Sequence, residues 1–160
     1  MNAAPLLEEI ARALQECGLE AVLVGNAAAA LQGAPVTTVD LDFMFRNTPS
    51  NMRKLKLLAD MLRGCILRPH RPASGLYRVV NEDRGIQLDF MSVLHGIRSY
   101  EGLRARATSL ELGSSTLLVA SLDDVVRSKR ALGRPRDNAV MQILEKTLDE
   151  KKRLKAKGAR

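Results

Sequence analysis

The chain is poor in aromatic residues and in cysteine. It has three Phe, two Tyr and no Trp among 160 residues, so its core has to be built mainly from Leu, Val, Ile, Ala and Met. Its two cysteines, Cys17 and Cys65, lack metal-ligand spacing and are too few for a disulfide framework. It also lacks an apolar run long enough to cross a bilayer and the N-terminal pattern of a signal peptide. We therefore expect a cytoplasmic protein with no membrane contact.

Positive charge is the main bias in what the chain does contain. Lys and Arg number 25 against 18 Asp and Glu, which gives a net charge of +7 at pH 7. Such a charge favours polyanionic partners, among them nucleotides and RNA. Six of the 25 basic residues lie in residues 151–160, so the excess also fits a solvated basic helix end. Charge alone leaves both interpretations open.

Helical and strand-like patterns of apolar residues follow one another along the chain. Helical spacing predicts helices over residues 5–17, 27–32, 49–63, 121–132 and from about 137 into the basic tail. Apolar or alternating runs predict strands over residues 21–24, 39–45, 65–68, 76–80, 86–93, 109–112 and 116–120. No repeat or linker divides the sequence. We expect one mixed α/β (α+β) domain over residues 1–160, with a C-terminal helical segment from about residue 121.

Three aspartates lie within apolar strand-like sequence, where an unpaired charge is costly. Alternation over residues 39–45 puts Asp40 and Asp42 on one face of a strand, roughly 7 Å apart along the backbone. Asp89 lies on the polar face of another predicted strand. Converging carboxylates can bind Mg²⁺ or Mn²⁺ together with nucleotide phosphates. An Asp-x-Asp pair by itself is also typical of a half-exposed strand.

A Gly-Asn turn, Gly25-Asn26, follows the first strand and leads into a helix. Backbone N–H groups at such a helix start can bind a triphosphate, although a glycine at this place also fits an ordinary tight turn. Thr38 precedes the acidic strand and is a further candidate for a phosphate contact. Its alternative explanation is the general preference of Thr for strands and turns.

Three motifs in combination resemble the nucleotidyltransferase superfamily typified by DNA polymerase beta: Val24-Gly25-Asn26, Asp40-Leu41-Asp42 and Leu88-Asp89. More narrowly, the chain is similar to small stand-alone members that include the AbiEii-like toxins of toxin–antitoxin pairs, over residues 27–33, 37–42 and 121–137. The resemblance covers roughly half of the chain, and each motif alone is weak. It implies a nucleotidyltransferase fold, with a mixed sheet flanked by helices.

The resemblance also implies roles for the residues of these motifs. Asp40 and Asp42 would bind the metal ions, and Asp89 would lie close to the attacking hydroxyl as a metal ligand or base. Gly25 and Asn26 would contact the nucleotide phosphates. Asn26 departs from the family pattern, where Gly or Ser is usual.

Basic residues near the C-terminal helices form a second group of candidates. In the toxin-like members a helical Lys followed by a downstream Asp supports nucleotide binding, and Lys129 with Asp137 corresponds to that arrangement. Arg130, Arg134 and Arg136 lie close by in the sequence. They can form a phosphate clamp, or they can be solvated cations that complement a helix C-terminus.

The implied reaction is Mg²⁺-dependent transfer of a nucleoside monophosphate from an NTP to a hydroxyl of RNA, protein or a small molecule. A chain of this length would need a cognate partner protein or a homodimer to recognise a large acceptor. The implied biological role is that of a toxin–antitoxin component.

Two other functions stay open. A catalytically impaired nucleotide- or RNA-binding module of the same fold would explain Asn26. A phosphatase with Asp40 as nucleophile would leave the Gly-Asn turn unexplained. His70 and His95 have no partner at metal-ligand spacing and are predicted on loops or at the surface.

Overall fold

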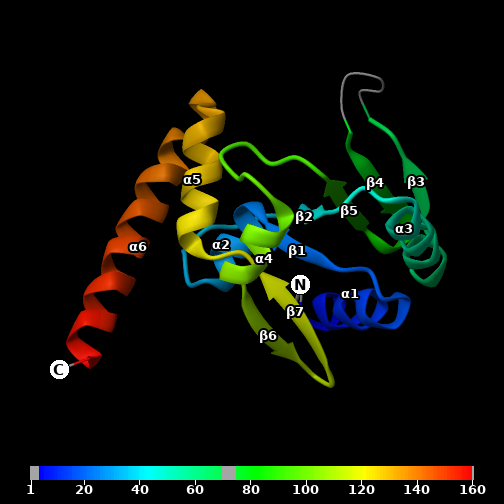
Figure 1. Ribbon diagram of the computed structural model, residues 1–160, viewed down its shortest axis with the longest axis horizontal. Coiled ribbons are helices and arrows are strands. Elements are labelled where there is room, and N and C mark those ends of the chain that lie inside the picture. Colours follow the sequence, from blue (N-terminus) through cyan, green and yellow to red (C-terminus); the bar gives the residue numbers. More distant parts are fainter. Residues whose placement is uncertain (1–3, 70–74, 160) are drawn as a thin grey trace.

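A single mixed sheet runs through the protein, with helices around it (Figure 1), in a computed structural model that describes residues 4–69 and 75–159. The helices are α1 (Ala4–Cys17), α2 (Gly25–Leu31), α3 (Pro49–Met61), α4 (Tyr100–Arg106), α5 (Leu122–Leu132) and α6 (Asn138–Gly158), with short 3₁₀ turns η1 (Glu82–Arg84) and η2 (Pro135–Asp137). The strands are β1 (Ala21–Val24), β2 (Leu41–Phe45), β3 (Cys65–Leu67), β4 (Tyr77–Asn81), β5 (Ile86–Met91), β6 (Thr108–Leu112) and β7 (Ser115–Val119).

The sheet has the order β3-β4-β5-β2-β1-β7-β6. Two neighbouring pairs, β2 with β5 and β1 with β7, are parallel, and the other neighbours are antiparallel. This is the mixed sheet flanked by helices that the sequence predicts, so the predicted fold class is confirmed. The three strands next to or within the predicted motifs, β1, β2 and β5, are central and adjacent.

All three phenylalanines lie in the core and fix the register of the central strands. Phe43 of β2 and Phe90 of β5 are paired in register, and their rings stack with centroids 5.1 Å apart and an interplanar angle of 12°. Phe45 meets the Phe90 ring edge-on, with centroids 5.8 Å apart. Because successive side chains of a strand point to opposite faces, burial of these rings turns Asp42 and Asp89 together toward the other face.

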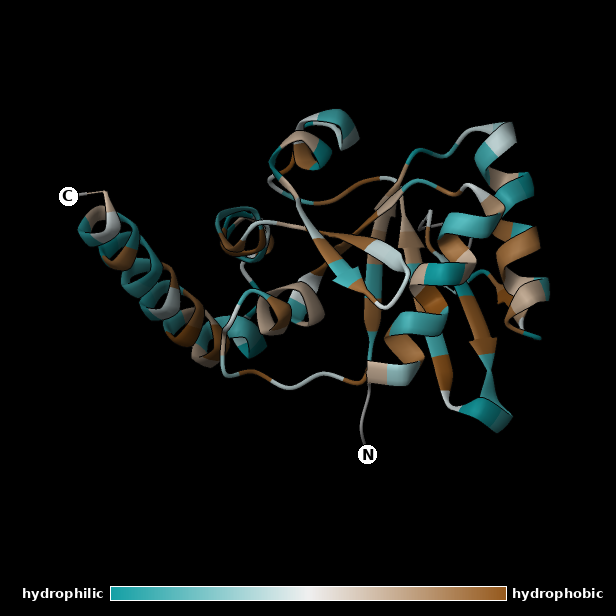
Figure 2. Cartoon of the chain, turned by 90° about the horizontal axis from the view of Figure 1, so that it is seen from below, coloured by the Kyte–Doolittle hydropathy of each residue, from teal (hydrophilic) through white to brown (hydrophobic). Residues whose placement is uncertain are grey.

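Helices α1, α2 and α3 pack on the sheet, whereas α5 packs on α2 and α6. Helix α1 packs against β6, β7 and α3, while α2 packs against β1, β2 and α5. Helix α6 packs on α5 and then extends away from the rest of the molecule (Figures 1 and 2). Leu144 is its one buried residue in the described range, and its last turns are exposed and polar. At the start of the basic tail Lys151 donates to Gln32 O at 2.6 Å and Lys152 pairs with Asp123, and residues 153–159 form an exposed helical arm. None of the described helices is long and apolar enough to cross a membrane.

Three local differences separate the sequence prediction from the structure. Helix α2 begins at Gly25, so Gly25 and Asn26 form its first turn. Strand β2 begins at Leu41, which places Asp40 just before the strand and not within it. Helix α4 was not predicted, because only Tyr100 and Leu103 of its seven residues are buried and so give little helical periodicity.

Candidate active site

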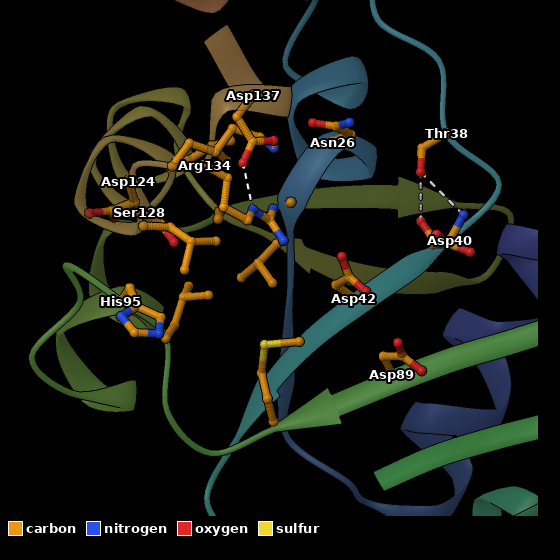
Figure 3. A pocket seen from close by; sticks show the side chains of 18 of the residues that line it. Asn26, Thr38, Asp40, Asp42, Asp89, His95, Asp124, Ser128, Arg134 and Asp137 are labelled. Carbon is orange, nitrogen blue, oxygen red and sulfur yellow. Dashed lines mark hydrogen bonds and ion pairs between the residues drawn. The ribbon is translucent and has the colours of Figure 1, made fainter. Parts of the chain in front are cut away.

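One pocket of about 700 Å³ collects the residues that the sequence singles out. Its walls are the junction of β1 and α2, the start of β2, part of β5, and the segment from α5 to η2 (Figure 3). All the predicted site residues line it: Gly25, Asn26, Thr38, Asp40, Asp42, Asp89, Lys129 and Asp137. The structure thus brings together residues far apart in sequence, while their roles stay predictions.

The three predicted metal-binding carboxylates lie on one side of this pocket (Figure 3). Asp42 of β2 is paired in register with Asp89 of β5. Asp40 is exposed and accepts a hydrogen bond of 3.4 Å from Gln87 Nε2. Thr38 holds the backbone at this point, because its hydroxyl accepts from the Asp40 N–H at 3.1 Å. The acidic side is therefore built from two adjacent strands and the turn that leads into one of them.

Asp42 carries the clearest electrostatic signature of the site. Burial and the nearby charges of Asp89 and Asp40 raise its pKa to about 6, although Lys129 and Arg134 oppose the shift. A raised carboxyl pKa at a cluster of like charges means that the negative charge of Asp42 lacks full compensation. A bound cation would supply that compensation, and carboxylate oxygens are the ligands that Mg²⁺ and Mn²⁺ favour.

Asp89 is already paired within the protein. Arg78 of β4 donates to its carboxylate through Nε at 2.7 Å and through a terminal nitrogen at 2.8 Å. The two residues are in register across the β4–β5 hairpin. The sequence prediction missed Arg78, although a hairpin that turns between Asn81 and Ile86 places Arg78 opposite Asp89. Counting back from that turn would have found the pair.

The three carboxylates differ in how well they fit a metal ion. Among residues 4–69 and 75–159, no group of three His, Cys, Asp or Glu side chains is close enough together to hold one. Asp40 and Asp42 fit the ion by their oxygen donors and by the uncompensated charge of Asp42. Asp89 fits less well as a third ligand, because Arg78 already donates to both of its oxygens and offsets its charge.

Gly25 is required by the close approach of the backbone to Asp42. Its φ is +68°, and a Cβ at this position would lie 2.9 Å from Asp42 Oδ2. The next side chain, Asn26, has a buried Oδ1 atom that accepts no hydrogen bond from any described residue. An unpaired buried carbonyl costs roughly 1–3 kcal/mol. Asn26 lines the pocket, but this oxygen is itself closed to solvent, so a ligand donor would reach it only after the side chain turns.

We expect Gly25→Ala to destabilise the protein more than Gly85→Ala does. Both glycines have φ near +65° (+68° and +63°), but nothing lies within 4 Å of a Cβ added at Gly85. The backbone strain, about 1 kcal/mol, is therefore common to both, and the difference isolates the contact with Asp42. Urea unfolding measures it. Equal losses for the two variants would show that the Asp42 carboxylate moves aside freely.

The opposite side of the pocket is basic and rests on a buried ion pair. Lys129 Nζ lies 3.2 Å from Asp137 Oδ1, and both side chains are 9% exposed. Arg134 donates to the other oxygen of Asp137 at 2.7 Å (Figure 3). Burial alone would raise the pKa of Asp137, but the hydrogen bonds from Arg134 and Lys129 outweigh it and lower that pKa. Arg136 also lines the pocket.

Of the remaining candidates, some line the pocket and others do not. Arg130 does not line the pocket and pairs with Glu145 at 2.7 Å. His95 is exposed, as predicted, yet it lines the pocket. His70 lies outside the described residues. Asp124 and Ser128 line the pocket as well; neither was predicted as a site residue, because the helical pattern alone assigns Asp124 to the capping of α5.

The pKa of Asp42 predicts how the stability of the metal-free protein depends on pH. A carboxyl pKa raised on folding adds stability below its unfolded value near 4 and removes it as the pH rises through about 6. Asp42→Asn should therefore stabilise the protein by roughly 2–3 kcal/mol at about pH 8 and by little at about pH 4. Urea unfolding in the presence of a chelator measures this, with the exposed Asp149→Asn as control. If Asp42→Asn raises the free energy of unfolding equally at both pH values, the raised pKa of Asp42 is contradicted.

The fold agrees with comparisons to known proteins. The chain matches the family described as "Nucleotidyl transferase of unknown function (DUF2204)" over residues 4–159. It therefore belongs to this nucleotidyltransferase family. The predicted membership of the superfamily is confirmed. No comparison tests the similarity to AbiEii-like toxins, which stays a prediction. A search of curated proteins gave no match.

Solved structures share the fold at low sequence identity. The antibiotic-resistance factor ANT(2'')-Ia, solved in complex with adenylyl-2''-tobramycin, aligns with a TM-score of 0.61 and 14% identity, over 95% of this chain and 92% of that one. TM1012 of Thermotoga maritima aligns with a TM-score of 0.59 and 20% identity, over 91% and 92%. A nucleotidyltransferase-like protein of Paracoccidioides brasiliensis gives 0.57 and 14%, over 91% and 75%. At these identities the likeness establishes the fold.

Proposed function

We propose that the protein transfers a nucleoside monophosphate from an NTP to a hydroxyl acceptor, with Asp40 and Asp42 as ligands of Mg²⁺ or Mn²⁺. The observation that carries the proposal is the uncompensated Asp42 carboxylate, whose pKa is raised to about 6 beside Asp89 and Asp40. It faces a basic wall across one pocket. A metal-bound triphosphate has the charges that these two sides require.

The proposed binding of the nucleotide uses both walls of the pocket. The phosphates lie between the acidic side and the two basic residues Lys129 and Arg134. Both of these cations already bind Asp137, and they would bind the phosphates as a second anion. The first turn of α2, with Gly25 and Asn26, supplies backbone N–H groups to the phosphates. Thr38 lies at the edge of the same pocket and holds Asp40 in place.

The proposed chemistry is a single displacement at phosphorus. The acceptor hydroxyl oxygen forms a bond to the α-phosphorus, the bond from that phosphorus to the bridging oxygen breaks, and pyrophosphate leaves with the electron pair. Asp89 accepts the proton of the hydroxyl through an oxygen lone pair that Arg78 leaves free. A bound divalent cation would neutralise charge that develops on the phosphate oxygens. The protein itself contributes positioning and fixed charges.

The impaired binding module of the same fold is a second candidate. The specific observation in its favour is the bidentate Arg78–Asp89 pair, because it neutralises the third carboxylate of the motif. In that case nucleotide binding would persist without transfer.

Incubation of the protein with each labelled NTP and total cellular RNA or protein tests the proposal. Label on a macromolecule, with release of pyrophosphate, identifies the base and the acceptor together. The same incubation with the small-molecule fraction of a cell extract tests the third class of acceptor, a small molecule.

The toxin role is a finer part of the same proposal. Expression of the parent chain should arrest growth if the protein is a toxin, and Asp42→Asn should relieve that arrest. Nucleotide binding without any labelled product would support the binding module instead.

A further inference from the structure

A second pocket, outside the candidate active site, is lined by three arginines and no acidic residue. It has a volume of about 550 Å³ and is lined by Gly96, Arg98, Ser99, Gly102, Arg106 and Arg127. We call Arg98, Arg106 and Arg127 the arginine cluster. They come from three segments, namely the loop after β5, helix α4 and helix α5. Nothing in the proposed nucleotide site uses them.

A buried carboxylate beneath this pocket fixes two of the three arginines. Asp124 is 1% exposed and accepts from Arg106 Nε at 2.8 Å and from Arg127 Nη1 at 3.0 Å. Ser121 Oγ lies 3.1 Å from the same carboxylate. The side chains of Arg106 and Arg127 are nevertheless 46% and 55% exposed. Their other guanidinium N–H groups are thus held in place yet accessible, which lowers the entropic cost of binding an anion.

The charge of the cluster is only partly compensated. Asp124 is the sole acidic partner of Arg106 and Arg127 among the ion pairs of the described residues. Arg98 is exposed and makes no ion pair with any described residue. Three positive charges against one carboxylate leave two in excess. Exposed arginines around a pocket are suited to phosphate groups, which they bind through paired N–H donors.

The pocket is adjacent to the candidate active site. Asp124 lines the first pocket and pairs with two arginines of the second. His95 lines the first, and its chain neighbour Gly96 lines the second. Gly96 lies so close to α5 that an added Cβ would be 2.9 Å from Arg127 O. The two pockets therefore share a wall made of α5 and the loop after β5.

We propose that the arginine cluster binds backbone phosphates of an RNA strand whose end enters the neighbouring pocket as the acceptor. A cationic acceptor would be repelled at this entrance, whereas a polyanion is attracted to it. The binding of phosphates is inferred from the arginine cluster alone, whereas the role of the strand as acceptor rests on the proposed function. The site fixes the strand through its backbone, so it carries no base preference of its own.

Fluorescence anisotropy with a short labelled single-stranded RNA, without nucleotide, tests phosphate binding. Each lost charge-assisted contact costs about tenfold in affinity, so Arg98→Gln/Arg127→Gln should raise the Kd about 100-fold. The slope of log Kd against log salt should fall by about 1.4. The matched control, Arg104→Gln/Arg130→Gln, removes the same charge near the same helices, from surface pairs with Glu20 and Glu145.

The outcomes separate this proposal from its competitors. Arg98→Gln alone remains informative if the double variant unfolds, because Arg98 makes no ion pair with the described residues. Equal Kd values for the double variant and its control would overturn the proposal and assign binding to general charge. If tripolyphosphate binds the cluster without displacing RNA, the proposal is overturned and the ligand of the cluster is a small anion.

In transfer assays, Arg98→Gln should raise KM for RNA and leave KM for NTP unchanged. Cluster-dependent RNA binding without any transfer would refute the proposed function and the acceptor role, and leave the phosphate site standing.

Discussion

Asp42→Asn is expected to lower the kcat/KM of nucleotidyl transfer at least about a thousandfold. Asn keeps the volume of the side chain but removes the negative charge that a cation would neutralise. Its neighbours in the sheet and the Phe43–Phe90 stack remain, so the fold is retained. The assay is the release of pyrophosphate from the NTP and acceptor identified by labelling.

The control for this loss is Asp149→Asn, an exposed acidic residue on α6. It removes the same charge far from the pocket and should retain parent activity. Asp42→Asn should also unfold no more easily than the parent, because its charge is disfavoured in the folded state. An Asp42→Asn variant with activity within about tenfold of the parent would remove Asp42 from the reaction.

Asp137→Ala is expected to have the largest effect on stability, a loss of about 3–5 kcal/mol in the free energy of unfolding. It leaves Lys129, a buried cation with 9% side-chain exposure, without its carboxylate. Because the folded-state pKa of Asp137 is lowered, its stabilisation is present above the ordinary carboxyl pKa and is lost as the pH falls. The difference in the free energy of unfolding between parent and variant should therefore become smaller at acidic pH. Urea unfolding at several pH values measures it.

A double variant separates the structural from the functional role of this pair. Lys129→Met/Asp137→Leu removes both charges and leaves no buried ion unpaired, so most of the lost stability should return. Nucleotide binding should stay weak, since the phosphates lose Lys129. If Asp137→Ala unfolds like the parent, the pair is solvated and the buried wall described here is wrong. If the double variant binds nucleotide normally, Lys129 has no part in the site.

Only part of the candidate site has a local signal in the sequence, and Lys129 with Asp137 was predicted through the family resemblance alone. Alternation within a strand gives the face of Asp42 and of Asp89, and a glycine between a strand and a helix marks the turn at Gly25. Their assembly into one pocket needed the resemblance to a known family as well. The parallel pairing of β2 with β5, which puts Asp42 beside Asp89, joins residues 47 apart and leaves no local trace.

The residues that the sequence did not reveal depend on long-range contacts. Arg78 matters through its cross-strand pairing with Asp89. Asp124 follows the pattern of a capping residue, and its pair with Arg127 is a local i,i+3 contact within α5. Only the approach of α4 to α5 shows that it also binds Arg106. The alternation of residues 39–45 also extended the predicted strand over Asp40, because a polar residue just before a strand fits the same period as one within it.

Calorimetric titration of the parent protein with each NTP, with and without Mg²⁺ or Mn²⁺, tests the central claim most directly. In the proposed site a cation would offset the charge of Asp42 beside Asp40 and Asp89, so that a triphosphate can approach. We therefore predict that at least one NTP binds in the presence of the metal, that a chelator abolishes this binding, and that Asp42→Asn shows none. Absence of any metal-dependent binding at millimolar nucleotide would contradict the account of this pocket as a nucleotidyltransferase site.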